Sequence, residues 1–175
     1  MRAMLEQNLE LLRQGIELLE RIDDDLYGAG AAVQHEASYR VGPHLRHCLD
    51  AYGCLLAGLD TARVDYDARR RSPEVESRRT AGLAALRAAE VSLGGLAAWD
   101  PETELRVKVD TPAAAPGAWT RSTLARELQF LVGHTVHHFA LIAFILRRHG
   151  FEPGREFGVA PSTLDHWARE ESIAG

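Results

Sequence analysis

The chain has 175 residues, of which 46% are hydrophobic and 26% are charged, a balance that predicts one globular domain over residues 1–175 with its own core. Its formal net charge of −5 lacks the basic excess that binding to a nucleic-acid backbone requires, so no nucleic-acid partner is expected. Two cysteines without a disulfide or zinc spacing, no run of about 18 apolar residues, and an acidic amphipathic N-terminus predict a cytoplasmic protein with no membrane segment.

The first part of the chain has two stretches with apolar residues at helical spacing. In residues 2–26 these recur at steps of three and four, which predicts one amphipathic helix. They are Leu5, Leu9, Leu12, Ile16, Leu19 and Ile22. Residues 27–40 are rich in small side chains without a sustained period, so we expect a loop there. A proline is tolerated at the first helical position, and Pro43 therefore predicts a second helix that ends near Leu59.

A third helix and a short β excursion are expected in the middle of the chain. Residues 60–71 are charged and aperiodic, which favours a loop. A serine cap, a proline and an acid at residues 72–74 then predict a helix that extends to about Ala97. Alternating apolar and charged residues within 102–110 indicate a strand, with residues 117–120 as its candidate partner.

The last long periodic stretch predicts a fourth helix that begins at Ser122 or Thr123 and ends at Gly150. Ser162 with an acid three residues later resembles a capping box, so a brief terminal helix through Trp167 is expected. Four long amphipathic helices with one β excursion make an all-α four-helix bundle the expected fold.

The fourth predicted helix has the sequence HTVHH, three of the chain's eight histidines within five positions. His134 and His138 are four residues apart, so both side chains project from one helical face and can bind one metal ion. A catalytic metal site of this kind takes a third protein ligand and leaves one position open. The second helix offers His44 and His47. Histidines that only form hydrogen bonds in the core or at the surface remain the alternative, and Thr135 rules out the HExxH protease motif.

The segments PHLRHCLD, ELQFLVGHTVHHFALI and FGVAPSTLDHW, in this order, resemble the DinB/YfiT-like superfamily of four-helix metalloenzymes. The resemblance spans nearly the whole chain. It implies a bundle with a crossover connection between helices 2 and 3 and a short β excursion between helices 3 and 4. It also implies a divalent metal held by one histidine of the second helix and the pair on the fourth. By position these are His47, His134 and His138.

Two further histidines are ambiguous. His44 and His137 each lie three residues from a proposed ligand, about 60° around the helix, so both can line the same cavity. His44 replaces His47 as the ligand if the register of the second helix differs. Alternatively, either ring only forms a hydrogen bond at the rim of the site.

Two carboxylates point toward the same side of the predicted bundle. Glu127 lies seven residues before His134, about 20° from its stripe, and Asp50 lies one turn after His47. Each could accept a hydrogen bond from a ligand imidazole or act as a base. Ordinary solvated or ion-paired carboxylates are the alternative.

Three consecutive arginines, Arg69, Arg70 and Arg71, lie in the loop expected between the second and third helices. They could bind the carboxylates of a thiol cofactor if that loop folds over the site. A solvated run of charges is the alternative.

Three neutral imidazoles leave a divalent ion its full double charge, which lowers the pKa of a bound water or thiol. The resembled family contains enzymes that activate a low-molecular-weight thiol, thiol-dependent isomerases, and hydrolases. We therefore predict an S-transferase or hydrolase that uses zinc, nickel, iron or manganese on a small-molecule substrate. The alternative is a noncatalytic bundle that binds metal or a small molecule. A homodimer through an apolar helix face is expected.

Overall fold

The structure is a computed structural model that describes residues 2–28, 40–109 and 117–174. This part of the chain is mostly helical and contains a small three-stranded sheet. The elements, in chain order, are α1 (Arg2–Arg21), α2 (Asp24–Gly28), α3 (Val41–Gly58), the 3-10 helix η2 (Leu59–Thr61), β1 (Arg63–Asp65), α4 (Pro73–Ser77), α5 (Arg79–Gly94), the 3-10 helix η3 (Gly95–Ala98), β2 (Glu104–Lys108), β3 (Thr120–Thr123), α6 (Leu124–Arg148) and α7 (Pro161–Ala174). The predicted helical class with a β excursion is confirmed.

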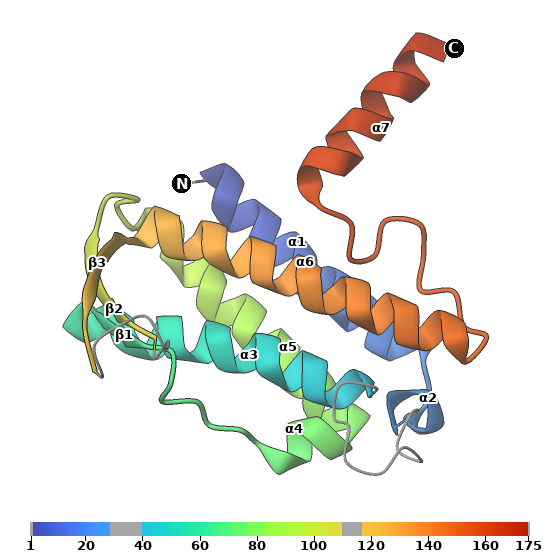
Figure 1. Ribbon diagram of the computed structural model, residues 1–175, viewed down its shortest axis with the longest axis horizontal. Helices are drawn as coiled ribbons and strands as arrows, with labels where there is room; N and C mark the ends of the chain where they lie inside the picture. Colours follow the sequence, from blue (N-terminus) through green and yellow to red (C-terminus); the bar gives the residue numbers. More distant parts are fainter. Residues whose placement is uncertain (1, 29–39, 110–116, 175) are drawn as a thin grey trace.

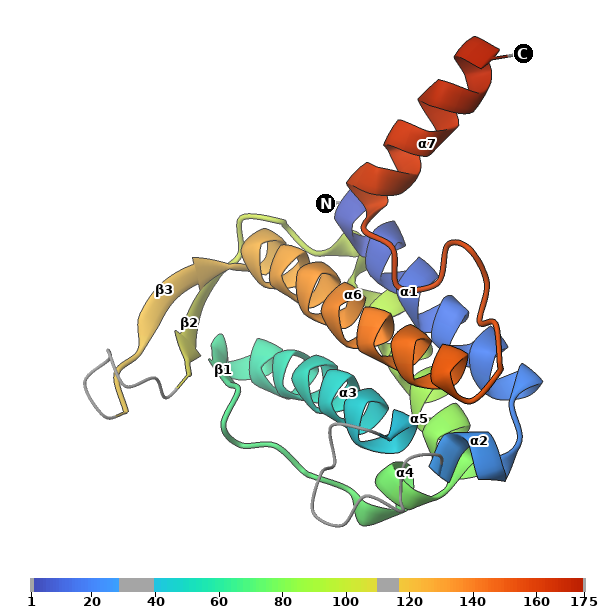
Figure 2. The ribbon, with the colours of Figure 1, turned by 45° about the vertical axis from the view of Figure 1, so that its right-hand side comes forward.

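The long helices pack side by side around a leucine-rich core. α1 and α3 each pack against both α5 and α6, and Figures 1 and 2 show α3 and α6 running in opposite directions. The apolar stripe of α6 predicted from the sequence is buried, with Leu124, Leu128 and Leu131 all at 0% exposure. Two helical stretches, Arg79–Ala98 and Leu124–Arg148, are apolar and long enough to cross a membrane by length and composition alone.

The sheet has the order β1-β2-β3 and lies at one end of the helices (Figure 1). β1 pairs in parallel with β2, and β2 pairs antiparallel with β3. β1 follows the end of α3, whereas β3 leads directly into α6. The sheet therefore connects the end of α3 to the start of α6, the two helices that carry the clustered histidines.

The β prediction was right for one strand and incomplete for the others. β2 falls within the predicted residues 102–110, of which Asp110 lies outside the described residues. Its partner β3 begins at Thr120, so the predicted 117–120 ends where the strand starts. β1 was predicted as loop, because three residues carry no detectable alternation and the strand depends on pairing with residues 43 positions away, as Arg63 with Arg106.

Two predicted helices are interrupted. The first was expected over 2–26, but α1 ends at Arg21 and Asp23 begins a separate helix by accepting a hydrogen bond at Oδ1 from the Leu26 amide, at 2.8 Å. Tyr27 and Gly28, expected to be loop, belong to this helix α2. The remaining residues of that predicted loop, apart from Arg40, lie outside the described part of the chain.

The third helix was expected to be continuous from Pro73 to Ala97. It breaks at Arg78, which has extended backbone angles (φ −124°, ψ 118°) between α4 and α5. The Tyr27 hydroxyl donates to the Val75 carbonyl at 2.5 Å, and that carbonyl would otherwise accept from the Arg79 amide of an unbroken helix. A tertiary hydrogen bond thus replaces a helical one.

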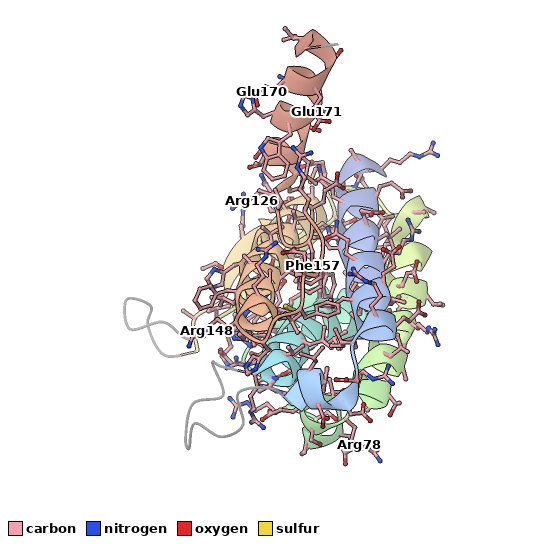
Figure 3. All side chains as sticks on the ribbon, turned by 90° about the vertical axis from the view of Figure 1, so that its right-hand side faces the viewer. Arg78, Arg126, Arg148, Phe157, Glu170 and Glu171 are labelled. Carbon is pink, nitrogen blue, oxygen red and sulfur yellow. The ribbon has the colours of Figure 1, made fainter. Side chains whose placement is uncertain are left out.

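The C-terminal segment packs back on α6 before it leaves the body. Phe157 stacks on Phe139 with ring centroids 4.8 Å apart, and Figure 3 shows Phe157 between α1 and α6. Gly158 (φ +72°) lies so close that a Cβ there would be 2.6 Å from the Ala140 amide nitrogen, so only glycine fits. α7 then projects away from the other helices (Figures 1 and 3). It extends to Ala174, beyond the predicted end at Trp167.

Candidate metal centre

The antiparallel packing of α3 and α6 determines how far along each helix, counted from the sheet, the histidines lie. His47 lies eleven residues before Gly58, the end of α3, and His134 lies ten residues after Leu124, the start of α6. Both helices meet the sheet at these ends, and each residue advances a helix by about 1.5 Å. Nearly equal counts from the same end therefore bring the two residues level, with His138 one turn further along α6.

The structure brings these three histidines together. The ring centroids of His47 and His134 are 4.8 Å apart, and that of His138 is 4.7 Å from each of them. One ring nitrogen of each side chain lies within 4.8 Å of the corresponding nitrogens of the other two, so the cluster could hold a metal ion. Metal–nitrogen bonds of about 2.0–2.1 Å in a tetrahedral site place two ligand nitrogens about 3.4 Å apart. The three nitrogens would have to move closer together to bind one ion at that spacing.

The histidine cluster has the protonation state that a metal requires. Burial is the largest cause that lowers the pKa of His134 to about 4 and that of His138 to about 3, and the neighbouring histidines lower them further. Burial, followed by the Arg69 and Arg46 charges, also lowers the pKa of His47. The imidazoles are therefore neutral at pH 7, with lone pairs available for a cation.

The Nδ1 atom of His134 is buried and has no hydrogen-bond partner among the described residues. A buried polar atom without a partner costs about 1–3 kcal/mol. A bound divalent ion, or a group that accompanies one, would give this atom the partner it lacks. The donor set therefore fits a divalent metal ion.

His44 and His137 surround the cluster at different depths. His44 is buried, and its Nδ1 lies 3.0 Å from Nδ1 of His138, so one ring donates to the other and fixes its orientation. His137 is exposed, with its ring centroid 5.1 Å from that of His138. Both rings therefore lie beside the same site, and His44 contacts His138, whereas His47 belongs to the three-histidine group itself.

Glu127 is buried one layer away from the histidines. Its carboxylate accepts hydrogen bonds from the Tyr66 hydroxyl at 2.7 Å and the Ser122 hydroxyl at 2.5 Å. The intervening ring is Phe130, which lies 5.2 Å from Tyr66 and 5.5 Å from His134 between centroids. Glu127 thus ties β3 and the segment after β1 to α6, and its hydrogen bonds go to hydroxyl groups.

Asp50 holds the arginine loop rather than a histidine. Its carboxylate accepts from the Arg46 guanidinium at 2.6 Å and from the Arg71 amide at 3.1 Å. Arg71 has φ +49°, a left-handed conformation that the Asp50 hydrogen bond helps to hold. Through this contact, Asp50 fixes the backbone that carries Arg69.

The three arginines differ in what they face. Nη1 of Arg69 lies 3.4 Å from Nδ1 of His47, and its Nε is buried with no hydrogen-bond partner among the residues that the structure describes. Arg70 and Arg71 have exposed side chains. The arginine loop therefore does fold toward the site, but with one guanidinium, that of Arg69.

Sequence reasoning missed a buried polar chain beside the cluster. Thr135 donates to the Tyr52 hydroxyl at 3.2 Å, Tyr52 donates to Oδ1 of Asn8 at 2.9 Å, and Asn8 donates to the Leu128 carbonyl at 3.0 Å. These bonds link α1, α3 and α6 within one residue of His134, which fixes the rotation of the two helices that carry the histidine cluster. The signal in the sequence was an asparagine on the apolar face of the first helix.

A groove of about 720 Å³ lies between α3, α5 and the arginine loop. It is lined mainly by small side chains of α3 and α5, with Arg46, Asp50 and Arg70 at its polar side, and none of the clustered histidines lines it. The groove is therefore separate from the candidate metal centre.

Comparison of the chain with family models, with curated proteins and with solved structures found no match. The assignment of a function therefore depends on the geometry of the histidine cluster.

Proposed function

We propose that this protein is a divalent-metal-dependent enzyme with a DinB-like four-helix bundle made of α1, α3, α5 and α6, including a crossover connection between α3 and α5. His47, His134 and His138 hold the ion. The observation that carries the proposal is the convergence of three half-buried, neutral imidazoles on one point from two antiparallel helices.

A divalent ion on three neutral ligands supplies a Lewis acid that makes a thiol or water available as an anion near neutral pH. The residues of the chain provide the surroundings for this chemistry. His44 orients His138 through the contact between their Nδ1 atoms. Phe130 covers His134 and restricts access of water from that side. The resulting activity is an S-transfer or hydrolysis on a small molecule.

A noncatalytic metal-binding or small-molecule-binding protein is the second candidate. One observation favours it: the hydrogen bonds of Glu127 and Asp50 go to other groups, so neither carboxylate lies poised as a base at the histidines. Under the enzymatic proposal, the activated thiol or water gives its proton directly to solvent. The two candidates share the metal site and differ in turnover.

Metal analysis of tag-free protein tests the site. After dialysis against zinc, nickel, iron(II) or manganese, the protein is expected to retain one equivalent of at least one metal, and the double variant His134→Ala, His138→Ala is expected to retain none. A double variant of the exposed His149 and His166, both to alanine, is the matched control and should bind as the wild type does. Absence of uptake by the wild type, or full stoichiometry in the first variant, would refute the site.

Turnover is tested separately on the loaded protein. A small thiol with an activated aryl chloride reports S-transfer, in which a carbon–sulfur bond forms, chloride leaves and the thiol proton passes to solvent. A 4-nitrophenyl ester reports hydrolysis. Metal-dependent rates that disappear in the His134→Ala, His138→Ala variant support the enzyme, whereas stoichiometric metal with no rate on either substrate supports the noncatalytic candidate.

We also propose that the protein is a homodimer in a reducing cytoplasm. Phe130 and Phe144 on α6 are 43% and 57% exposed, which supports an apolar contact surface on this helix. Cys48 and Cys54 are free and buried, as in a compartment that keeps thiols reduced. Sedimentation of the wild type beside Phe144→Glu tests the dimer, and an unchanged mass of twice the chain in the variant would exclude this surface.

A further inference from the structure

The guanidinium of Arg69 lies beside the histidine cluster and has no anionic partner in residues 2–28, 40–109 or 117–174. Its Nη1 is 3.4 Å from Nδ1 of His47, and its Nε is buried with no hydrogen-bond partner in the described part of the chain. Among the residues that the structure describes, Arg69 forms no ion pair, in contrast to Arg46, which pairs with Asp50 and Glu76. A half-buried cation of this kind is normally compensated by a carboxylate.

The contact between Arg69 and His47 is compatible only with the metal-free centre. A guanidinium has donors and no acceptor, so Nδ1 of His47 accepts and the proton of the neutral ring is on Nε2. A metal ligand needs the lone pair on one nitrogen. If Nδ1 binds the ion, Arg69 loses that lone pair. If Nε2 binds it, the proton moves to Nδ1, and Nδ1 no longer accepts. In both cases Arg69 must find another acceptor when the ion binds.

The carboxylates near Arg69 have other partners. Asp50 accepts from Arg46 and from the Arg71 amide. Asp65 pairs with Lys108, and Glu127 accepts from two hydroxyl groups. Asp67 also has an interaction of its own. Metal binding adds two positive charges beside the guanidinium, and within the described residues Arg69 has no ion pair with any of these carboxylates. Within the described part of the chain no carboxylate supplies the negative charge, so a bound molecule is the source that we infer.

The geometry points to an anion-binding subsite at Arg69 that makes the centre selective for small molecules with a carboxylate. This inference rests on the proposed metal centre and specifies its substrate class. A planar guanidinium matches the two oxygens of a carboxylate. Only Arg69 of the three arginines faces the cluster, which suits a singly charged acid group. Its distance from His47 is short enough for the acid group and the metal-binding atom to belong to one small molecule.

Binding of mercaptoacetate and of its uncharged methyl ester to the cobalt(II)-loaded protein tests the subsite. Both probes carry the same thiol, and the sulfur-to-cobalt absorption reports binding without turnover. In Arg69→Gln, the affinity for mercaptoacetate is expected to fall about ten- to a hundredfold relative to the wild type, because one charge-assisted contact is lost. The affinity for the ester should change less than about twofold. Arg70→Gln is the matched control and should leave both affinities unchanged.

Different results would overturn the anion subsite at Arg69 and the metal centre. Suppose that the wild type binds both probes. If Arg69→Gln then loses no affinity for mercaptoacetate, or loses as much affinity for the methyl ester as for mercaptoacetate, the anion subsite is overturned and the metal centre remains. No cobalt uptake by the wild type would overturn the metal centre and the subsite with it. Cobalt stoichiometry and far-ultraviolet circular dichroism establish that each variant is folded and loaded. Arg69→Lys keeps the charge without the planar fork, and an affinity for mercaptoacetate as low as that of Arg69→Gln would show that the fork is required.

Discussion

Zinc binding at pH 6.0 should release few protons, because the histidine cluster is held neutral before the ion arrives. A metal ion competes with protons for the lone pairs of its ligands, so the number of protons released equals the number that the free site carried. Burial lowers the pKa of His134 and of His138, so these two rings carry few protons to release when zinc binds.

The expected release follows from the lowered pKa values of the histidines. Three unperturbed imidazoles of pKa 6.5 would together carry about 2.3 protons at pH 6.0. With pKa values of about 4 and about 3, His134 and His138 carry almost none. His47 also has a lowered pKa and contributes less than an unperturbed ring. A zinc-bound water with a pKa near 7 adds about 0.1. The total is fewer than about one proton.

Calorimetric titration of the metal-free protein with zinc in buffers of different ionisation enthalpy measures this quantity directly. The slope of the observed enthalpy against the buffer enthalpy is the number of protons released. The variant His134→Ala, His138→Ala should give no binding isotherm, which assigns the heat to the cluster. A release of two or more protons at pH 6.0 would show that the imidazoles are solvated and protonated, and would refute a buried, preformed site.

Four substitutions test the packing and the hydrogen bonds that position the site. Gly42→Ala should lower the free energy of unfolding by about 3 kcal/mol, because its Cβ would lie 2.0 Å from the Glu76 carbonyl oxygen. Gly53→Ala in the same helix meets nothing within 4 Å and should raise that free energy by about 0.5–1 kcal/mol; urea midpoints that move in the same direction for both would contradict the packing. Tyr66→Phe removes one of the hydrogen bonds of buried Glu127 and should lower the free energy of unfolding by about 1–3 kcal/mol. The cobalt stoichiometry should stay unchanged, and a loss of cobalt would instead show that this hydrogen bond is needed to position the centre. Asp50→Asn should lower mercaptoacetate affinity severalfold without affecting the methyl ester, because the loop that carries Arg69 loses its charged anchor.

The three-histidine cluster could be predicted because helices are rigid and periodic. The spacing of His134 and His138 fixes their common face from local geometry alone. His47 came from the family resemblance, and its level relative to His134 depends on how α3 and α6 meet the sheet. The contact of His44 with His138 could not be resolved from the sequence, because a rotation of α3 by 60° would exchange His44 and His47.

The features that could not be predicted depend on contacts between distant residues. β1 exists only through its pairing with β2, and the break at Arg78 depends on the Tyr27 hydroxyl bound to the Val75 carbonyl. The positions of Asp50 and Glu127 around their helices predicted that both carboxylates lie on the side of the histidines. Such positions give the direction of a side chain, but they do not determine which groups it binds. Asp50 instead binds Arg46 and the Arg71 amide, and Glu127 binds Tyr66 and Ser122.

The position of Arg69 couples the two ligands that the centre is proposed to bind. Without a metal, the guanidinium uses the lone pair of Nδ1 on His47, so it competes with the ion for that ligand and repels it. A carboxylate that draws Arg69 away from His47 removes both obstacles, and the anion therefore increases the affinity for the metal. By linkage, the metal must increase the affinity for the anion by the same factor. The same contact thus disfavours either ligand alone, and the loaded centre is most stable when the cation and the acid are bound together.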